Sequence, residues 1–324
     1  MKSGSTLEKV LASGKPAVTA ELGPPMSADP HEVIKKARQL KGFCDAANIT
    51  DCQTAVVRIS SIAAAAIALQ QGLEPVMQMT CRDRNRIAMQ ADLLGGAALG
   101  LKNCLCIAGD HQSFSAAGRL KGHPGAKNVY DVDTCQLVGI MKKMRDESKQ
   151  DGGDPIEVPP KFFIGASWTP MADPIDFRPI NLMKKVNAGA DFIQTQGIYD
   201  MSLFREQMAK IRNMGLHEKT AILAGIIVPK SAMMLKYMDS SVAGVSVPKE
   251  LIDRMNKAKA AAGEDKKKMK ELQEQEGIKI TIELIHQALE TPGVRGVHIQ
   301  AIEWESAIEG IVKAAGLYPR PSFD

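Results

Sequence analysis

The feature that most constrains this chain is a regular alternation of short apolar runs with longer amphipathic segments. Residues 185–200, KVNAGADFIQTQGIYD, show one complete step: a helix end, a turn of small residues, and a buried strand over 191–195 that leads to Gln196. Strands that alternate with helical patterns are typical of βαβ units, which build parallel sheets. The sequence therefore predicts a protein of the α/β class.

The same reading along the whole chain predicts eight strands. They cover residues 17–22, 46–50, 74–80, 103–108, 162–167, 191–196, 220–227 and 294–300. The helices are expected at about 30–40, 58–71, 84–99, 134–149, 176–188, 199–214, 230–238 and 304–315. Eight repeats favour a closed barrel over an open sheet, and 324 residues is a normal length for such a barrel with insertions. We predict a single (β/α)8 TIM barrel.

Two segments are insertions, because they are longer than the connections that the strand–helix repeat requires. Residues 110–133 form an extended loop after strand 4 that is rich in Gly, His and Asp. Loops of this length in compact domains are usually functional or disordered. Residues 247–290 add extra helices before strand 8, and they include a charged run at 264–276. We interpret that run as the solvated face of a helix.

Composition narrows the class of function. The net charge of +4 is too small and too dispersed to indicate nucleic-acid binding, although it suits a small anionic ligand. No apolar run reaches the roughly 18 residues of a membrane span, and the N-terminus lacks the apolar core of a signal peptide, so we expect a cytoplasmic protein. The six cysteines contain no CxxC pair. We interpret them as small buried hydrophobes and predict no metal site.

Polar residues follow several predicted strands, at the end where barrel enzymes carry their active sites. Glu21, in TAELGPP, is either a pocket carboxyl whose raised pKa suits proton donation or a salt-bridged loop residue. Asp110 follows Gly109, which allows close approach of a flat ligand, but it could equally cap a loop. Gln196 offers a donor and an acceptor to a heterocycle, or it faces the core.

Three arginines open the helix expected at 84–99. Arg82, Arg84 and Arg86 lie in QMTCRDRNR, where arginines and a helix N-terminus together suit a phosphate or carboxylate. The alternative is an ordinary surface helix start. The chain has neither GxGxxG nor GxxxxGK[ST], which disfavours a Rossmann dinucleotide site.

Taken together, these motifs resemble the methylenetetrahydrofolate reductase family of flavin-dependent (β/α)8 barrels. The resemblance covers roughly 17–315 and rests on AELGPP, QMTCRDRNR, IAGDH, the Tyr130-Asp131 region and NLMKKVNAGADFIQTQGIYD, of which the last is the most specific. It implies one flavin-binding TIM-barrel domain over 1–324. It also implies the reduction of 5,10-methylenetetrahydrofolate to 5-methyltetrahydrofolate by hydride transfer from a bound reduced flavin.

The resemblance also implies roles for individual residues. Glu21 matches the general acid that helps to open the five-membered ring of the folate to an iminium. Asp110 matches an aspartate near both flavin and pterin, and Gln196 matches a glutamine that binds the folate ring. The residues expected at the flavin are Thr50, Gln78, Arg82, Asp110, Tyr130, Lys185 and Ala190.

The chain departs from the better-known members of this family at four places. Gln78 replaces a histidine and Ala108 replaces an arginine, so the flavin is either FAD or FMN. The loop VPKSAMM lacks the aromatic residue that stacks on a nicotinamide, and Trp304 occupies a familiar arginine position. These two changes disfavour direct use of NADH or NADPH. The sequence thus resembles the branch from anaerobic and acetogenic bacteria that works with an electron-delivering partner subunit.

Two other functions stay open at this stage. One is a pterin-binding methyltransferase barrel without flavin, and the other is a non-catalytic subunit of a redox complex. The expected partners are a folate substrate and the electron-delivering subunit, and the sequence leaves a homo-oligomer open. Flavin absorbance would separate the leading function from the other two.

Overall fold

The computed structural model describes residues 1–113, 115–116 and 120–323, and its centre is a closed barrel of parallel strands. The strand order around the barrel is β1-β10-β9-β8-β7-β4-β3-β2. The strands are β1 (Ala17–Leu22), β2 (Ala46–Ile49), β3 (Pro75–Thr80), β4 (Asn103–Ile107), β7 (Phe163–Trp168), β8 (Phe192–Gly197), β9 (Ala221–Ile227) and β10 (Val294–Gln300). The predicted (β/α)8 barrel is confirmed, and every expected strand limit lies within one residue of the observed one.

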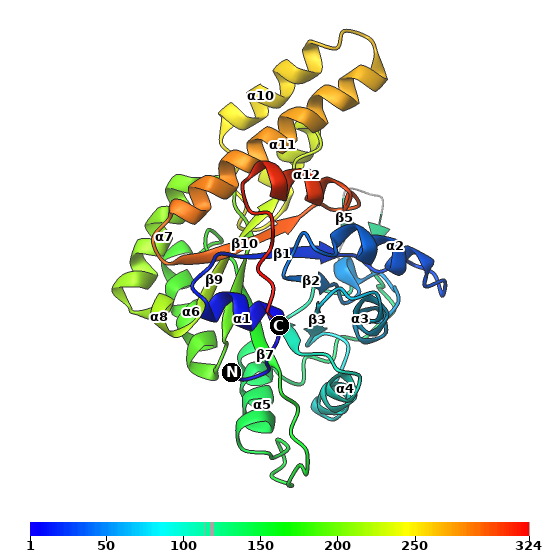
Figure 1. The fold of residues 1–324 in the computed structure, drawn as a ribbon, viewed down its shortest axis with the longest axis vertical. Helices are drawn as coiled ribbons and strands as arrows, with labels where there is room; N and C mark the ends of the chain where they lie inside the picture. Colours follow the sequence, from blue (N-terminus) through cyan, green and yellow to red (C-terminus); the bar gives the residue numbers. More distant parts are fainter. Residues whose placement is uncertain (114, 117–119, 324) are drawn as a thin grey trace.

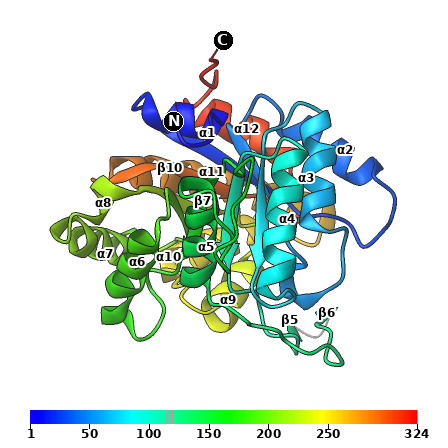
Figure 2. The ribbon, with the colours of Figure 1, turned by 90° about the horizontal axis from the view of Figure 1, so that it is seen from below.

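Helices surround this barrel, and each barrel strand is followed along the chain by at least one of them (Figures 1 and 2). They are α2 (His31–Leu40), α3 (Ser61–Gln70), α4 (Arg86–Ala98), α5 (Thr134–Asp146), α6 (Arg178–Ala188), α7 (Met201–Asn213), α8 (Leu216–Lys219), α9 (Ala232–Ser241) and α12 (Ala307–Ala314). Two short 3-10 turns, η1 (Gln53–Ala55) and η2 (Ile175–Phe177), lie in loops. None of the helices in the described part of the chain is long and apolar enough to cross a membrane.

A helix that the sequence pattern did not reveal, α1 (Thr6–Ala12), covers the amino end of the barrel (Figures 1 and 2). Leu7, Val10 and Leu11 are buried there against the first inward-facing residues of the strands, including Phe163 and Phe192. A helix of seven residues is too short to show a clear amphipathic period, and its apolar face is defined only by this contact. The barrel is therefore closed at its amino end, which leaves the carboxyl end for a site.

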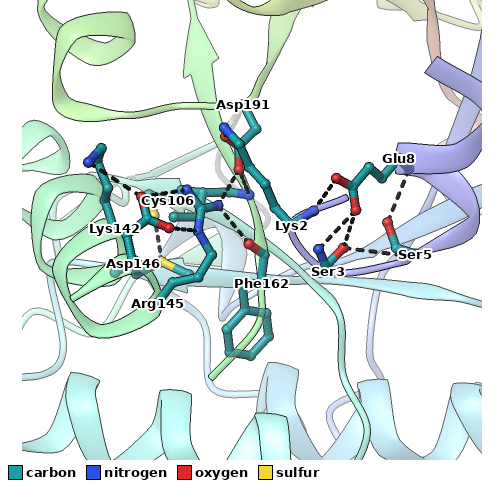
Figure 3. Close-up of polar contacts among 12 residues, drawn as sticks. Lys2, Ser3, Ser5, Glu8, Cys106, Lys142, Arg145, Asp146, Phe162 and Asp191 are labelled. Carbon is teal, nitrogen blue, oxygen red and sulfur yellow. Dashed lines mark hydrogen bonds and ion pairs between the residues drawn. The ribbon is translucent and has the colours of Figure 1, made fainter. Parts of the chain in front are cut away.

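Charged groups tie this closed end together (Figure 3). Glu8 accepts hydrogen bonds from the backbone N–H groups of Ser3 and Gly4 at 2.9 and 2.8 Å. Lys2 pairs with Asp191, just before β8. The buried Asp191 carboxylate also accepts a hydrogen bond from Arg145 Nη1 of α5 at 2.6 Å. The start of β8 is thereby fixed to both α5 and the N-terminal segment.

Both predicted insertions are present. The loop after β4 contains a small antiparallel pair, β5 (Ser115–Ala116) and β6 (Leu120–Lys121), while positions 114 and 117–119 of the predicted loop lie outside the described residues. The extra helices before β10, the eighth barrel strand, are α10 (Lys249–Ala260) and α11 (Lys266–Glu290), which form an arm that projects from the barrel (Figure 1). The charged run at 264–276 is mostly exposed, as interpreted from the sequence. The assignment of 1–324 to one domain stays a prediction.

Candidate active site

A cavity of about 350 Å³ opens among the carboxyl ends of the barrel strands, at the end opposite α1. Amide side chains dominate its polar lining. They are Asn48, Gln53, Gln78, Gln194, Gln196 and Gln300. Arg82, Asp51, Asp110 and His298 add charged or titratable groups, and Thr80, Ser167, Thr169 and Thr195 add hydroxyls. Cavities of this size are at the lower end of the range for small-molecule sites, and amides suit the edge of a heterocycle with alternating donors and acceptors.

The polar lining follows from the two-residue period of strands. Gln194 and Gln196 lie two apart on β8, so both side chains point into the barrel; His298 and Gln300 repeat this pattern on β10. We did not predict Asn48, Gln53, Gln194, His298 or Gln300 as site residues. The signal that could have found most of them is a polar residue two positions before the end of a buried strand.

A hydrogen-bonded network forms the floor of the cavity. Asn48 Nδ2 donates to Gln194 Oε1 at 2.6 Å, and Gln194 Nε2 donates to Thr19 Oγ1 at 3.1 Å. His298 Nδ1 lies 3.0 Å from the same Thr19 oxygen. Burial lowers the pKa of His298 to about 3, so its imidazole is neutral at physiological pH. A satisfied buried network of this kind holds the groups above it in fixed positions.

Glu21 is the penultimate residue of β1 and lies beside the cavity. The register between β1 and β10 places Ala20 opposite Ile299, which sets Glu21 next to Gln300. Burial, and next the negative charge of Glu305, raise the pKa of Glu21 to about 7, although a hydrogen bond from Gln300 and the charge of Lys36 act against them. The residue keeps partial exposure. A carboxyl with such a pKa can hold and release a proton near neutral pH.

Asp110 lies in the cavity wall, in the loop after β4. One carboxylate oxygen accepts the backbone N–H of Thr54 at 2.9 Å, which joins this loop to the loop after β2. Gly109, directly before it, has φ +88° and lies so close to β3 that an added Cβ would be 3.0 Å from Thr80 Cβ. Cys52, Thr54 and Ala55 also have positive φ. Such costly backbone conformations cluster at functional sites.

The three predicted arginines all have carboxylate partners within the chain. Arg82 is 2% exposed, pairs with Asp83, and donates to the backbone oxygens of Cys52 and Asp110 at 3.1 and 3.0 Å. Arg84 binds Asp51 and Asp92, and Arg86 binds Asp131 and Asp151. These contacts join the loops after β2, β3 and β4. These arginines therefore link the loops to one another, and of the three only Arg82 lines the cavity.

The predicted site residues fall into three groups. Gln78, Arg82, Asp110 and Gln196 line the cavity. Four others, Glu21, Thr50, Tyr130 and Lys185, lie behind the wall, and each forms a hydrogen bond to a residue that lines the cavity. The partner of Glu21 is Gln300. The other contacts are Thr50 Oγ1 to Gln53 Oε1 at 2.7 Å, Tyr130 Oη to the Gly109 oxygen at 3.1 Å, and Lys185 Nζ to the Ser167 oxygen.

Ala190 forms the third group, because the structure does not bring it to the cavity. It is 3% exposed and precedes Asp191 at the amino end of β8, which is the closed end of the barrel. Its environment is the hydrophobic layer between barrel and helices. Ala190 and Gln196 belong to one continuous sequence motif, but β8 lies between them. They are therefore at opposite ends of the barrel.

A second cavity of about 420 Å³ adjoins the first and shares Asp51 and Arg82 with it. Arg58 Nε and Gln112 Oε1 belong to its lining residues, and both atoms are buried with no hydrogen-bond partner among the described residues. Buried polar atoms of native proteins normally have partners. A donor and an acceptor are therefore available to a bound molecule that extends from the first cavity.

The sequence matches the family described as "Methylenetetrahydrofolate reductase" over residues 6–316. It is 24% identical over 249 residues to "Methylenetetrahydrofolate reductase 1" of Schizosaccharomyces pombe, covering 76% of this chain and 36% of that protein. It is 31% identical over 249 residues to "Methylenetetrahydrofolate reductase 2" of the same organism, covering 74% and 35%. The chain thus spans about a third of the length of these curated relatives.

A solved structure shares the fold. It is described as an uncharacterized protein from Clostridium thermocellum that binds two copies of 5-methyl-5,6,7,8-tetrahydrofolic acid. It superposes with a TM-score of 0.61 at 14% identity and covers 96% of this chain and 99% of that one.

Proposed function

This chain belongs to the methylenetetrahydrofolate reductase family, and from that premise we propose that it reduces 5,10-methylenetetrahydrofolate to 5-methyltetrahydrofolate with the help of a bound flavin. The observation that carries the proposal is a carboxyl with a pKa of about 7, Glu21, beside an amide-lined cavity at the carboxyl end of the barrel. A barrel of the same fold, the Clostridium thermocellum protein, binds a methylated folate.

The residues present fit a flavin. Gln78 and Asp110, together with the backbone around Gly109, would hold the ring system in the first cavity. The adjoining cavity offers Arg58 Nε and Gln112 Oε1, two buried atoms that lack partners in the described part of the chain, to the remainder of the cofactor. When bound, a reduced flavin supplies the hydride. We leave FAD and FMN as the two candidates, because either can extend into the second cavity.

The chain's own residues would bind the folate and control its proton. Gln196 and the other wall amides donate to and accept from the edge of the pterin, which fixes its orientation. Glu21 donates a proton to the ring nitrogen that leaves the bridging carbon, so that the five-membered ring opens to the iminium which accepts the hydride. Asp110, a carboxylate of the cavity wall, stabilises positive charge that develops on the substrate.

We further propose that electrons reach the site from a partner protein. Within the described residues, no Phe, Tyr or Trp side chain lines the cavity. Tyr199 is buried and donates to the Ile227 oxygen at 3.0 Å, while Trp304 borders a separate cavity beside Glu305. Among the described residues of the cavity wall, a nicotinamide would find no Phe, Tyr or Trp ring to stack on, and orientation contributes much of the rate of a transfer reaction.

The purified protein tests this proposal. We expect flavin absorbance in the preparation or on addition of FAD or FMN. Under anaerobic conditions, chemically reduced protein should be reoxidised by 5,10-methylenetetrahydrofolate, with one 5-methyltetrahydrofolate formed per flavin. Folate binding without flavin binding would instead indicate a pterin-binding methyltransferase barrel. Absence of both would favour a non-catalytic subunit of a redox complex.

A further inference from the structure

The loop after β10, residues 301–306, carries a buried carboxylate to which the proposed mechanism assigns no role. Glu305 is 6% exposed, and its Oε1 lies 3.0 Å from Lys36 Nζ of α2, whose side chain is 12% exposed. A buried ion pair is weak evidence for stability, because removing both charges from water offsets most of their attraction. This pair therefore invites a functional explanation.

Lys36 joins the two loops that flank Glu21. Besides Glu305, its ammonium group donates to the Gly23 oxygen after β1 at 3.2 Å and to Glu303 Oε2 at 3.3 Å. Three acceptors match the three hydrogens of an ammonium group. The loop after β10 is thus fixed relative to the end of β1.

The same loop is constrained from its other side. Lys230, in the loop after β9, donates to the Ile302 oxygen, and its Nζ lies 5.9 Å from the centre of the Trp304 ring. Glu303 has φ +53°, a conformation that is costly for a residue other than glycine. Such a backbone persists only where its surroundings hold it. The position of Glu305 is therefore well defined.

We propose that Glu305, held by Lys36 beside the loop that follows Glu21, is a positioning residue of the active site: its negative charge keeps the proton on the Glu21 carboxyl until the substrate takes it. The inference rests on the proposed function, in which Glu21 is the proton donor. It adds a residue that touches neither substrate nor cofactor and acts only through Glu21.

The charges around Glu21 agree with this role. Glu305 is the charged neighbour that raises the pKa of Glu21, since two nearby carboxylates resist being ionised together. Lys36 and the hydrogen bond from Gln300 lower that pKa. Glu303 and Lys230 are further charged groups of these loops, and the Glu303 side chain is 62% exposed.

The test is a titration of the Glu21 carboxyl by ¹³C NMR in the cofactor-free protein, with its signal assigned by its loss in Glu21→Gln. We expect Glu305→Gln to lower the Glu21 midpoint by about one pH unit. The matched control is Glu303→Gln, which alters the same loop and the same lysine at an exposed position and should shift the midpoint much less. Glu305→Asp keeps the charge and should restore a near-normal midpoint.

A second variant covers the case in which Glu305→Gln does not fold. Lys36→Gln removes a positive charge that lowers the pKa of Glu21, so it should raise the Glu21 midpoint. An unchanged Glu21 midpoint in Glu305→Gln, or a shift equal to that of Glu303→Gln, overturns the inference. So does an unchanged Glu21 midpoint in Lys36→Gln.

The folate reaction provides an independent readout. In single turnovers of reduced enzyme, Glu305→Gln should move the alkaline limb of the pH profile to lower pH by the same amount as the NMR midpoint, with the folate concentration that gives half the maximal rate unchanged. A normal NMR shift in a protein that does not reduce folate would refute the proposed function and leave the Glu305–Glu21 coupling intact. The two failures are therefore distinguishable.

Discussion

At the scale of single residues, the protonation of Glu21 decides when the site can act. Glu21→Gln should slow folate reduction by about 10²–10⁴-fold and leave flavin binding and reduction intact, because the proton is needed only to open the folate ring. In the wild type, the rate should fall as pH rises through about 7, where the acid form is lost. Anaerobic single turnovers across this range measure both effects, with Glu309→Gln on α12 as the control. Equal turnover in Glu21→Gln would remove Glu21 from the mechanism.

The same residue predicts how stability depends on pH. Its pKa is about 7 in the folded chain and 4.5 as a free side chain, so the folded state binds more protons in between. Stability should therefore fall as pH rises from about 5 to 8, by an amount on the order of 3 kcal/mol at most. Glu21→Gln should lack this component, since it carries no charge. Urea unfolding of both proteins at pH 5.5 and 8 tests this, and parallel losses of stability would contradict it.

Asp110 is expected to influence the bound flavin rather than the proton. Its carboxylate lies in the cavity wall, where a negative charge disfavours the anionic reduced form and lowers the reduction potential. Asp110→Asn should therefore raise the midpoint potential and slow hydride delivery to folate. Potentiometric titration measures this, with Asp176→Asn, whose side chain is 90% exposed, as a control. No shift, or a downward shift, would exclude this role.

At the scale of elements, α1 closes the barrel at the end away from the site. Leu7 is fully buried against the starts of the strands, so Leu7→Ala should lower the free energy of unfolding by about 2–5 kcal/mol. Activity per folded molecule should be unchanged, because no residue of α1 lines the cavity. Denaturant unfolding and turnover measure the two quantities, and Lys9→Ala on the same helix is the control. Lost activity in a folded Leu7→Ala protein would show that the two ends of the barrel are coupled.

At the scale of the whole molecule, the source of electrons is the open issue. We expect NADH and NADPH to reduce the flavin of the isolated chain much more slowly than about 10 s⁻¹, a typical turnover rate. The reason is the lining of the cavity, whose described residues offer a nicotinamide no Phe, Tyr or Trp side chain to stack on. Stopped-flow bleaching of the flavin measures the rate. Fast bleaching that Trp304→Ala abolishes would show that this tryptophan replaces the missing aromatic residue and that no partner is needed.

The sequence by itself determined the barrel and a few of the residues at its carboxyl end. Strand limits were predictable because a buried parallel strand needs a continuous apolar run, and Gly turns mark its ends. Asp110 and Gln196 could be placed at the mouth because they lie within three residues of the carboxyl ends of such runs, whereas Gln78 was expected there from the family resemblance. These are local properties, and chain order alone fixes them.

The tertiary structure decided what depends on contacts between distant segments. It separated Ala190 from Gln196, although one motif contains both, because a strand carries them to opposite ends of the barrel. It engaged Arg84 and Arg86 with carboxylates from neighbouring loops, and Arg82 with the backbone oxygens of Cys52 and Asp110. It also brought Glu305 and Lys36 to Glu21 from the far end of the chain and from α2. No spacing in the sequence predicts such pairs, because closure of the barrel between β1 and β10 creates them.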